Sequence, residues 1–357
     1  MKILTDYNLQ GLEEVLSEYN IPSYKVKQIA VWLAKGYEFN DMSTLDKQLR
    51  TTLDSNFYAQ GAKILQKFIS RDGTIKYLFS LTDGNVVEGV FMRYNYGNTL
   101  CISTQVGCRM GCSFCASTLK GLIRNCSVGE MVSFVTLVNL DNGGTIEKRS
   151  VTNLVLMGSG EPLDNFDNVV AFLSAINSKD GLNISYRNIS LSTCGIVPNI
   201  YALADLKLGV NLTISLHSAY QEKREEIMPI AKQYNLTELI EASKYYFTTT
   251  GRRVIFEYTL IDGVNDGLDD AYQLAQLTRG FSHHINLIRL NPVAERKHRP
   301  TNDQHAKYFL TKLTEFGCSA TLRRQLGVDI AGACGQLRQS YLEQKVSKPI
   351  DKPIDNK

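Results

Sequence analysis

Predicted strands and helices alternate between residues 99 and 320, and this alternation constrains the fold more than any other feature of the chain. Strands that alternate with helices of about 10 to 15 residues form βαβ units and a parallel sheet. About six such units are too few to close an eight-stranded barrel. The sequence therefore predicts an α/β fold with an open, partial (β/α)6 barrel. The expected strands cover residues 99–104, 151–157, 188–192, 212–216, 254–259 and 284–290, and helices are expected over 236–247 and 269–278.

Two other kinds of segment flank this region. Residues 1–60 carry apolar side chains at helical spacing, with Pro22 between two helices and Ser43 or Thr44 as the N-cap of a third. Residues 61–100 alternate in polarity around Asp83-Gly84, which is typical of a β-hairpin. We therefore expect an N-terminal helical accessory domain (1–60), a β-hairpin extension (61–100), a core (101–343) and a disordered, proline-containing and charged tail (344–357).

Three cysteines, Cys108, Cys112 and Cys115, form a CxxxCxxC set directly after the first expected strand of the core. Gly107 and Gly111 let the backbone curl around a metal centre. Iron–sulfur clusters usually take four cysteine ligands, whereas this loop offers three. The loop therefore predicts a 4Fe–4S cluster with one open iron. Structural zinc is the alternative, but it usually needs a second CxxC pair, which the sequence lacks.

Composition limits the remaining possibilities. The 357 residues include no run of the roughly 20 apolar residues that span a bilayer, and the N-terminus is too polar for a signal peptide. We therefore expect a cytoplasmic protein, in which its eight cysteines stay reduced. A formal net charge of +3 permits RNA binding without arguing for it.

The segments around these cysteines allow a more specific interpretation. The three cysteines lie in TQVGCRMGCSFCAST, which VEGV precedes and which MGSGEPLDN, LSTCG, ISLHS, NLIRLNP and ACGQLR follow in that order. On these segments the chain resembles the RlmN/Cfr family of radical S-adenosylmethionine (SAM) RNA adenosine methyltransferases over residues 5–340. The resemblance implies a 4Fe–4S cluster, SAM as cofactor and methylation of an adenosine in 23S rRNA, and in some tRNAs, by two molecules of SAM. It also implies a flavodoxin- or ferredoxin-type electron donor and a monomer.

Three catalytic roles follow from the resemblance. Cys334 matches the cysteine that carries the methyl group, and Cys101 matches the cysteine that releases the product by a transient disulfide with it. Glu88 matches the proton acceptor, and its apolar neighbours are expected to bury it and raise its pKa. SAM contacts are expected from Gly160, Glu161, Ser192, Ser215, Leu216, His217 and Asn291, all near strand ends. Cys126, Cys194 and Cys318 are assigned to packing.

Several positions depart from the usual family pattern. Ser159, Ala231, Ala331 and Gly332 replace the usual methionine, asparagine, aspartate and alanine, and Arg289 resembles the Cfr branch. Ala116-Ser117-Thr118 and Glu161-Pro162-Leu163 favour the RlmN branch, which methylates C2, over the Cfr branch, which methylates C8 and confers antibiotic resistance.

Two other functions remain open. One is a radical SAM enzyme acting on a peptide or small molecule, and the other is an RNA-binding module with a structural metal site. The basic groups that could contact RNA phosphates are 252–253, 296–299 and 323–324, although each is more often a solvated face.

Overall fold

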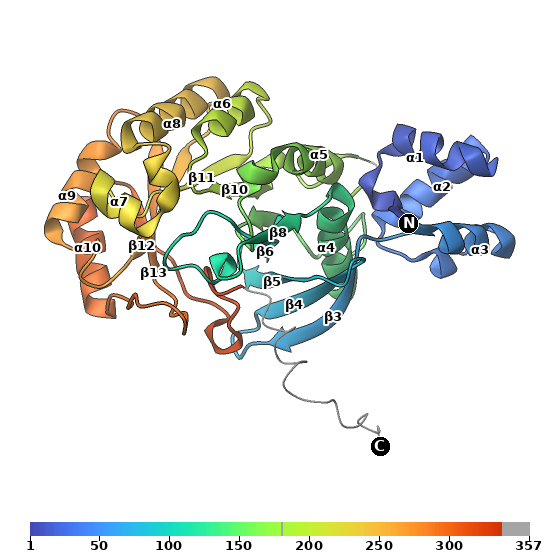
Figure 1. Cartoon of the computed structure of the whole chain (residues 1–357), viewed down its shortest axis with the longest axis horizontal. Coiled ribbons are helices and arrows are strands. Elements are labelled where there is room, and N and C mark those ends of the chain that lie inside the picture. The colour runs from blue at the N-terminus through green and yellow to red at the C-terminus, as the bar shows by residue number, and fades with distance from the viewer. Residues whose placement is uncertain (180, 338–357) are drawn as a thin grey trace, which may run out of the picture.

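The computed structural model describes residues 1–179 and 181–337, and the expected tail and core boundary at 343–344 lie outside these residues. Its centre is a ten-stranded sheet in the order β14-β13-β12-β11-β10-β9-β6-β5-β4-β3 (Figure 1). From β6 to β14 all neighbours are parallel, and from β3 to β6 all are antiparallel. No pairing among the described strands joins β14 to β3, so the sheet is not a closed barrel. The predicted fold class is confirmed.

Six parallel strands correspond to the predicted ones. They are β6 (Gly97–Cys101), β9 (Asn153–Leu156), β10 (Ile189–Thr193), β11 (Asn211–Ser215), β12 (Val254–Leu260) and β13 (His283–Arg289). A seventh, β14 (Ala320–Leu322), was not predicted. The helices between them are α4 (Val128–Asp141), α5 (Phe166–Asn177), α6 (Val197–Asp205), α7 (Gln221–Ile227), α8 (Leu236–Thr250), α9 (Leu268–Leu277) and α10 (Asp303–Glu315).

The predicted hairpin is formed by β4 (Ile75–Leu81) and β5 (Val86–Tyr94). An additional strand, β3 (Ala62–Ile69), pairs with the outer side of β4. On the other side, β6 pairs antiparallel with β5 and parallel with β9. The antiparallel segment is therefore continuous with the parallel sheet.

The N-terminal segment forms α1 (Leu9–Leu16), α2 (Ser23–Ala34) and α3 (Lys47–Asn56), beside the paired strands β1 (Lys2–Ile3) and β2 (Phe57–Tyr58). It lies at one end of the molecule and encloses its own apolar cluster (Figure 1). The predicted caps of the third helix, Ser43 and Thr44, are wrong. Asp46 caps α3 instead, because its Oδ1 accepts from Leu49 N at 2.8 Å.

The main hydrophobic core lies between the sheet and its covering helices. It leaves open the carboxyl ends of the parallel strands, where ligands bind in sheets of this kind. No described helix is long and apolar enough to cross a membrane.

Candidate active site

The cysteine loop follows β7 (Gln105–Gly107), a short strand paired with β8 (Leu122–Asn125). Gly107 has a φ of +78°, and a Cβ at this position would lie 2.0 Å from the carbonyl oxygen of Gly121. The same oxygen accepts a hydrogen bond from Cys108 N at 3.0 Å. Only glycine permits this approach, so Gly107 fixes where the loop leaves the strand.

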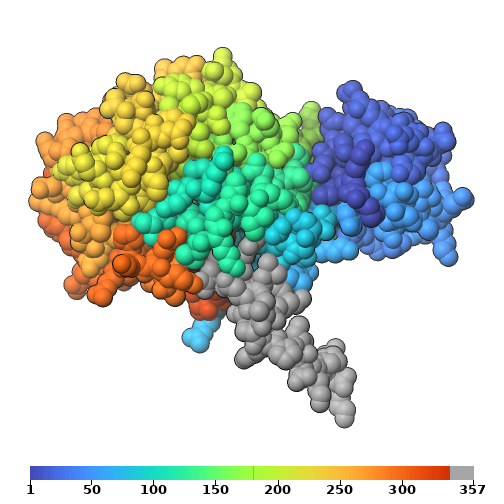
Figure 2. Space-filling model, viewed as in Figure 1, coloured from blue at the N-terminus to red at the C-terminus, as the bar shows by residue number. Residues whose placement is uncertain are grey.

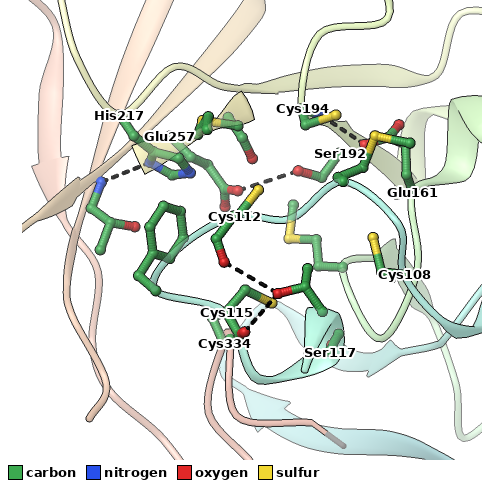
Figure 3. A pocket seen from close by; sticks show the side chains of 18 of the residues that line it. Cys108, Cys112, Cys115, Ser117, Glu161, Ser192, Cys194, His217, Glu257 and Cys334 are labelled. Carbon is green, nitrogen blue, oxygen red and sulfur yellow. Dashed lines mark hydrogen bonds between the residues drawn. The ribbon is translucent and has the colours of Figure 1, made fainter. Parts of the chain in front are cut away.

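Cys108, Cys112 and Cys115 line one cavity of about 140 Å³ at the carboxyl ends of the parallel strands (Figure 3). The teal part of the chain, which includes the cysteine loop, lies in the middle of the face that Figure 2 shows. Burial raises the pKa of the Cys108 thiol to about 12, and the thiol of Cys112 shifts in the same direction. Thiolates therefore form here only when positive charge, such as the iron of a cluster, compensates for desolvation.

Within the described residues, no three Cys, His, Asp or Glu side chains are arranged to hold a single metal ion. This is the arrangement that the zinc alternative requires. Three thiols around a common cavity fit the separate corners of a cluster.

Two side chains brace the cysteine loop from behind. Thr118 Oγ1 can donate to either of two carbonyl oxygens, that of Cys112 at 3.2 Å and that of Cys115 at 3.1 Å. Arg296 Nη2 donates to the same Cys115 oxygen at 3.0 Å and to Thr118 Oγ1 at 2.7 Å. Arg296, a candidate RNA contact in the sequence, therefore supports the cluster loop.

Glu161 lies in the wall of the cavity, on the side of Cys108 and Cys194 (Figure 3). Its Oε2 accepts from Cys194 N at 2.7 Å and its Oε1 from Leu163 N at 3.0 Å. Burial raises the pKa of this carboxyl, while the two amides favour the ionised form. A fixed carboxylate here suits the ammonium group of SAM. The neighbouring Gly160, at φ +107°, has no room for a side chain, since a Cβ would lie 2.6 Å from Gln105 Cβ.

Of the seven expected SAM contacts, six line this cavity, and Leu216 does not. Leu216 is fully buried, and its carbonyl oxygen accepts from Arg224 Nε at 3.0 Å. Arg224 Nη2 also donates to the carbonyl oxygens of Cys194, at 2.8 Å, and Ser215, at 3.3 Å. This fully buried arginine therefore fixes the ends of β10 and β11.

His217 takes a left-handed backbone conformation, at φ +56°, directly after β11. Its Nδ1 accepts from Thr259 N at 3.0 Å, and its ring meets Phe114 edge-on at a centroid distance of 5.0 Å. Burial lowers the pKa of this imidazole to about 3, so His217 is neutral and presents Nε2–H to the cavity.

Glu257 is a cavity residue that the sequence interpretation missed. Its carboxylate is buried, accepts from Ser192 Oγ at 3.3 Å and lies 3.4 Å from Arg323 Nη1. A single acidic residue within the apolar strand β12 was the available signal. The sequence predicted Arg323 only as a possible phosphate contact, but its side chain is 21% exposed and pairs with Glu257.

Cys101 and Cys334 line a second, smaller cavity together with Arg323. Cys334 also lines the cavity of Cys108, Cys112 and Cys115, called the cluster cavity below (Figure 3). Cys334 therefore borders both cavities. Burial raises the pKa of the Cys334 thiol, and the Arg323 guanidinium opposes this shift. Burial also raises the pKa of Cys101 to about 12. All eight cysteines are free thiols in this structure.

Glu88 lies on β5, two residues before Val90, which lines the second cavity and pairs with Cys101. Because alternate residues of a strand share a face, Glu88 points to the side that holds the two thiols. It is 4% exposed, which confirms the expected burial. Its Oε1 lies 3.5 Å from Lys76 Nζ, an ion pair that the sequence interpretation missed.

The departures from the family pattern lie around these groups. Ser159 is buried, and its amide donates to Ser103 Oγ at 2.9 Å. Ala331 has a φ of +49° three residues before Cys334, a conformation that aspartate tolerates better than alanine. Ala231 is buried, and its amide donates to the carbonyl oxygen of Met228 at 3.0 Å, while Arg289 pairs with Asp303 and Gln325.

Comparisons with known proteins agree with this geometry. Residues 102–275 match the family model of the radical SAM superfamily. A probable dual-specificity RNA methyltransferase RlmN of Clostridium perfringens is 45% identical over 348 residues, covering 97% of this chain and 99% of the relative. Its counterpart from Alkaliphilus oremlandii is 47% identical over 342 residues, covering 95% and 98%. The crystal structure of a radical SAM methyltransferase from Sphaerobacter thermophilus superposes with a TM-score of 0.90 at 38% identity, covering 95% of this chain and all of that one.

Proposed function

Since the chain belongs to the RlmN family of radical SAM RNA methyltransferases, we propose that it methylates C2 of an adenosine in 23S rRNA and of an anticodon-loop adenosine in some tRNAs. The observation that carries this proposal is the position of Cys334, which borders both the cluster cavity and the cavity of Cys101. One thiol can thus receive a methyl group on one side and release it on the other.

In the first half-reaction, the Cys334 thiolate attacks the methyl carbon of SAM. The S–C bond to Cys334 forms as the bond between that carbon and the sulfonium breaks, and S-adenosylhomocysteine leaves. Arg323 favours the thiolate against the cost of burial. Glu161, Ser192 and His217 line the cavity where the SAM would lie.

Cys108, Cys112 and Cys115 would hold the cluster. When bound, it would supply the electron that cleaves a second SAM to methionine and a deoxyadenosyl radical, and this radical would take a hydrogen atom from the methyl group on Cys334. The surrounding residues exclude water: Phe114, Met228 and Leu290 line the same cavity with apolar side chains.

In the second half-reaction, the methylene radical on the Cys334 sulfur adds to C2 of the adenosine and forms a C–C bond. The adduct then loses one electron, which returns to the electron-transfer system that supplied it, and Glu88 takes the proton from C2, a role that suits a buried carboxylate beside Lys76. The Cys101 thiolate then attacks the Cys334 sulfur. The S–S bond forms as the S–CH₂ bond breaks, the electron pair passes to the methylene carbon, and a proton completes the new methyl group.

The test is methylation of a 23S rRNA fragment by reconstituted enzyme with SAM and reduced flavodoxin as electron donor. Mass spectrometry against 2-methyladenosine and 8-methyladenosine standards should find the C2 product. Cys334→Ala should give neither product nor crosslink, whereas Cys101→Ala should accumulate protein bound to RNA.

Cys318→Ala is the matched control, because Cys318 belongs to the main core and lines neither cavity. The C8 product would assign the enzyme to the Cfr activity instead. Formation of methylated RNA by Cys334→Ala would contradict transfer through this thiol, whereas absence of methylated RNA from the wild type would leave the peptide or small-molecule alternative.

A further inference from the structure

A third cavity, of about 370 Å³, lies on the same inner face of the sheet as the cluster cavity. The strands show the relation between the two. On β10, Ser192 lines the cluster cavity and Ser190 the third, and on β12 Glu257 and Ile255 divide in the same way. Residues two apart share a face, so the third cavity lies toward the amino ends of these strands. Met157 lines all three cavities, which therefore adjoin.

The charge of the third cavity selects the class of its ligand. Arg187, Arg323 and Arg324 line it, and none of its described lining residues is acidic. Arg187 and Arg324 are exposed, and within the described residues neither side chain makes a hydrogen bond or ion pair. Guanidinium groups in this setting favour an anion such as a phosphodiester.

The interior of the cavity holds polar groups that a neutral ligand can satisfy. Thr213 is only 1% exposed, and its Oγ1 is buried without a hydrogen-bond partner among the described residues. Asn286, on β13, also lines the cavity, and no hydrogen bond of its side chain occurs in the described part of the chain. A hydroxyl and an amide both donate and accept, as the edge of a nucleobase does, and asparagine pairs well with adenine.

Two stacked tyrosines complete the lining. The rings of Tyr94 and Tyr96 lie 4.9 Å apart at an interplanar angle of 11°, where β5 ends and the turn to β6 begins. Tyr96 is 72% exposed, so a face of this pair is accessible from solvent. Exposed aromatic rings beside arginines are typical of sites for single-stranded nucleic acid.

We propose that the third cavity binds a single-stranded nucleotide of the RNA substrate. Arg187 and Arg324 face the phosphates, the tyrosine pair stacks on a base, and Thr213 and Asn286 bond to a base edge within the cavity. Arg323 lines both this cavity and that of the two thiols, so the bound nucleotide lies next to the methyl carrier. This inference rests on the proposed RNA methyltransferase function.

Binding of a fluorescently labelled RNA stem-loop, without reductant, tests the proposal on the full-length holoenzyme. Tyr96→Ala and Asn286→Ala should each weaken RNA binding by roughly fivefold or more. Fivefold corresponds to the smallest effect usually found when one base loses its stacking partner. Arg324→Gln should also reduce the slope of log K against log salt by about one. Tyr272→Ala and Arg279→Gln, exposed residues outside the three cavities, are matched controls that should bind as the wild type does.

The cluster absorbance and the unfolding temperature establish that each variant folds. Wild-type affinity in both Tyr96→Ala and Asn286→Ala, with RNA methylation by the wild type intact, would overturn the cavity assignment alone. Failure of the wild-type holoenzyme to methylate RNA would overturn the proposed function. Adenosine monophosphate that displaces the stem-loop at equal concentration would show a site for free nucleotides and contradict the RNA assignment.

Discussion

The ammonium group of Lys76 lies 3.5 Å from the Glu88 carboxylate, and both side chains are nearly buried. Lys76 also reaches the carbonyl oxygen of Ala331 at 3.5 Å, three residues before Cys334. One cation on β4 therefore connects the proposed proton acceptor with the segment that carries the methyl group.

Lys76→Met should slow release of the RNA from its adduct and destabilise the fold. Removing one member of a buried ion pair costs about 3–5 kcal/mol, and the low end is expected at 3.5 Å. The measurements are the amount of crosslinked RNA and the urea unfolding midpoint. Lys67→Met is the control, because Lys67 pairs with Asp141 at the surface and should cost about 1 kcal/mol or less. Normal adduct turnover in Lys76→Met would remove Lys76 from the mechanism.

Stability should fall below pH 6.5 because of His217. Burial holds the pKa of His217 in the folded state at about 3, below the ordinary 6.5. The unfolded chain therefore binds a proton that the folded chain does not, and acidification lowers the free energy of the unfolded state relative to the folded state. The loss is about 2 kcal/mol between pH 6.5 and 5, at about 1.4 kcal/mol per pH unit. His217→Asn keeps a side chain that tolerates the left-handed backbone but cannot titrate. Its unfolding free energy should depend less on pH in this window, and an unchanged pH dependence would contradict the assignment.

Arg224→Met should reduce the cluster content of the protein. The substitution removes the hydrogen-bond donors to the carbonyl oxygens of Leu216, Ser215 and Cys194 at the cavity wall. Each buried oxygen left without a partner should lower the free energy of unfolding by about 1–3 kcal/mol. Iron and sulfide per chain after anaerobic reconstitution should fall, together with thermal stability. Arg224→Lys restores the charge but not the forked geometry, so it should recover only part of the loss. Full iron content in Arg224→Met would leave the arginine without a role at the cluster.

Gly160→Ala should abolish SAM binding, because the added Cβ meets Gln105 and displaces the neighbouring Glu161. Equilibrium binding of SAM to the reconstituted enzyme measures the effect. Gly209→Ala is the matched control, since Gly209 also has a positive φ but open space around it. Wild-type affinity for SAM in Gly160→Ala would show that the site accommodates the added Cβ and would contradict this prediction.

The sequence predicted those parts of the molecule that carry a local pattern. The parallel strands have clear apolar runs, and the motif residues at their carboxyl ends follow from the topology. Strand β3 was missed because five of its eight residues, including Lys63 and Gln66, are exposed and two more are half-buried, so the strand shows no regular alternation of buried and exposed side chains. Strand β14 has only three residues, too few for a pattern.

The missing parts of the site are pairings between distant positions. Glu257 and Arg323 meet across 66 residues of sequence, and Lys76 reaches Ala331 across 255. Nothing in the local sequence around Arg323 or Lys76 distinguishes either cation from a solvent-exposed one. Only the packing of the sheet shows that they are buried beside carboxylates, which is what distinguishes them from solvated charges.

The double pairing of β6 has a mechanical consequence. Cys101 is hydrogen-bonded through its strand to β5, which holds Glu88, and to β9 on its other side. Neighbouring strands keep a fixed spacing of about 4.8 Å, so the sheet holds the backbones of Glu88 and Cys101 at a fixed separation. Cys334 lies beyond β14, outside these paired strands. In the proposed mechanism, the movement that brings the two thiols together therefore belongs to the segment of Cys334 and not to the sheet.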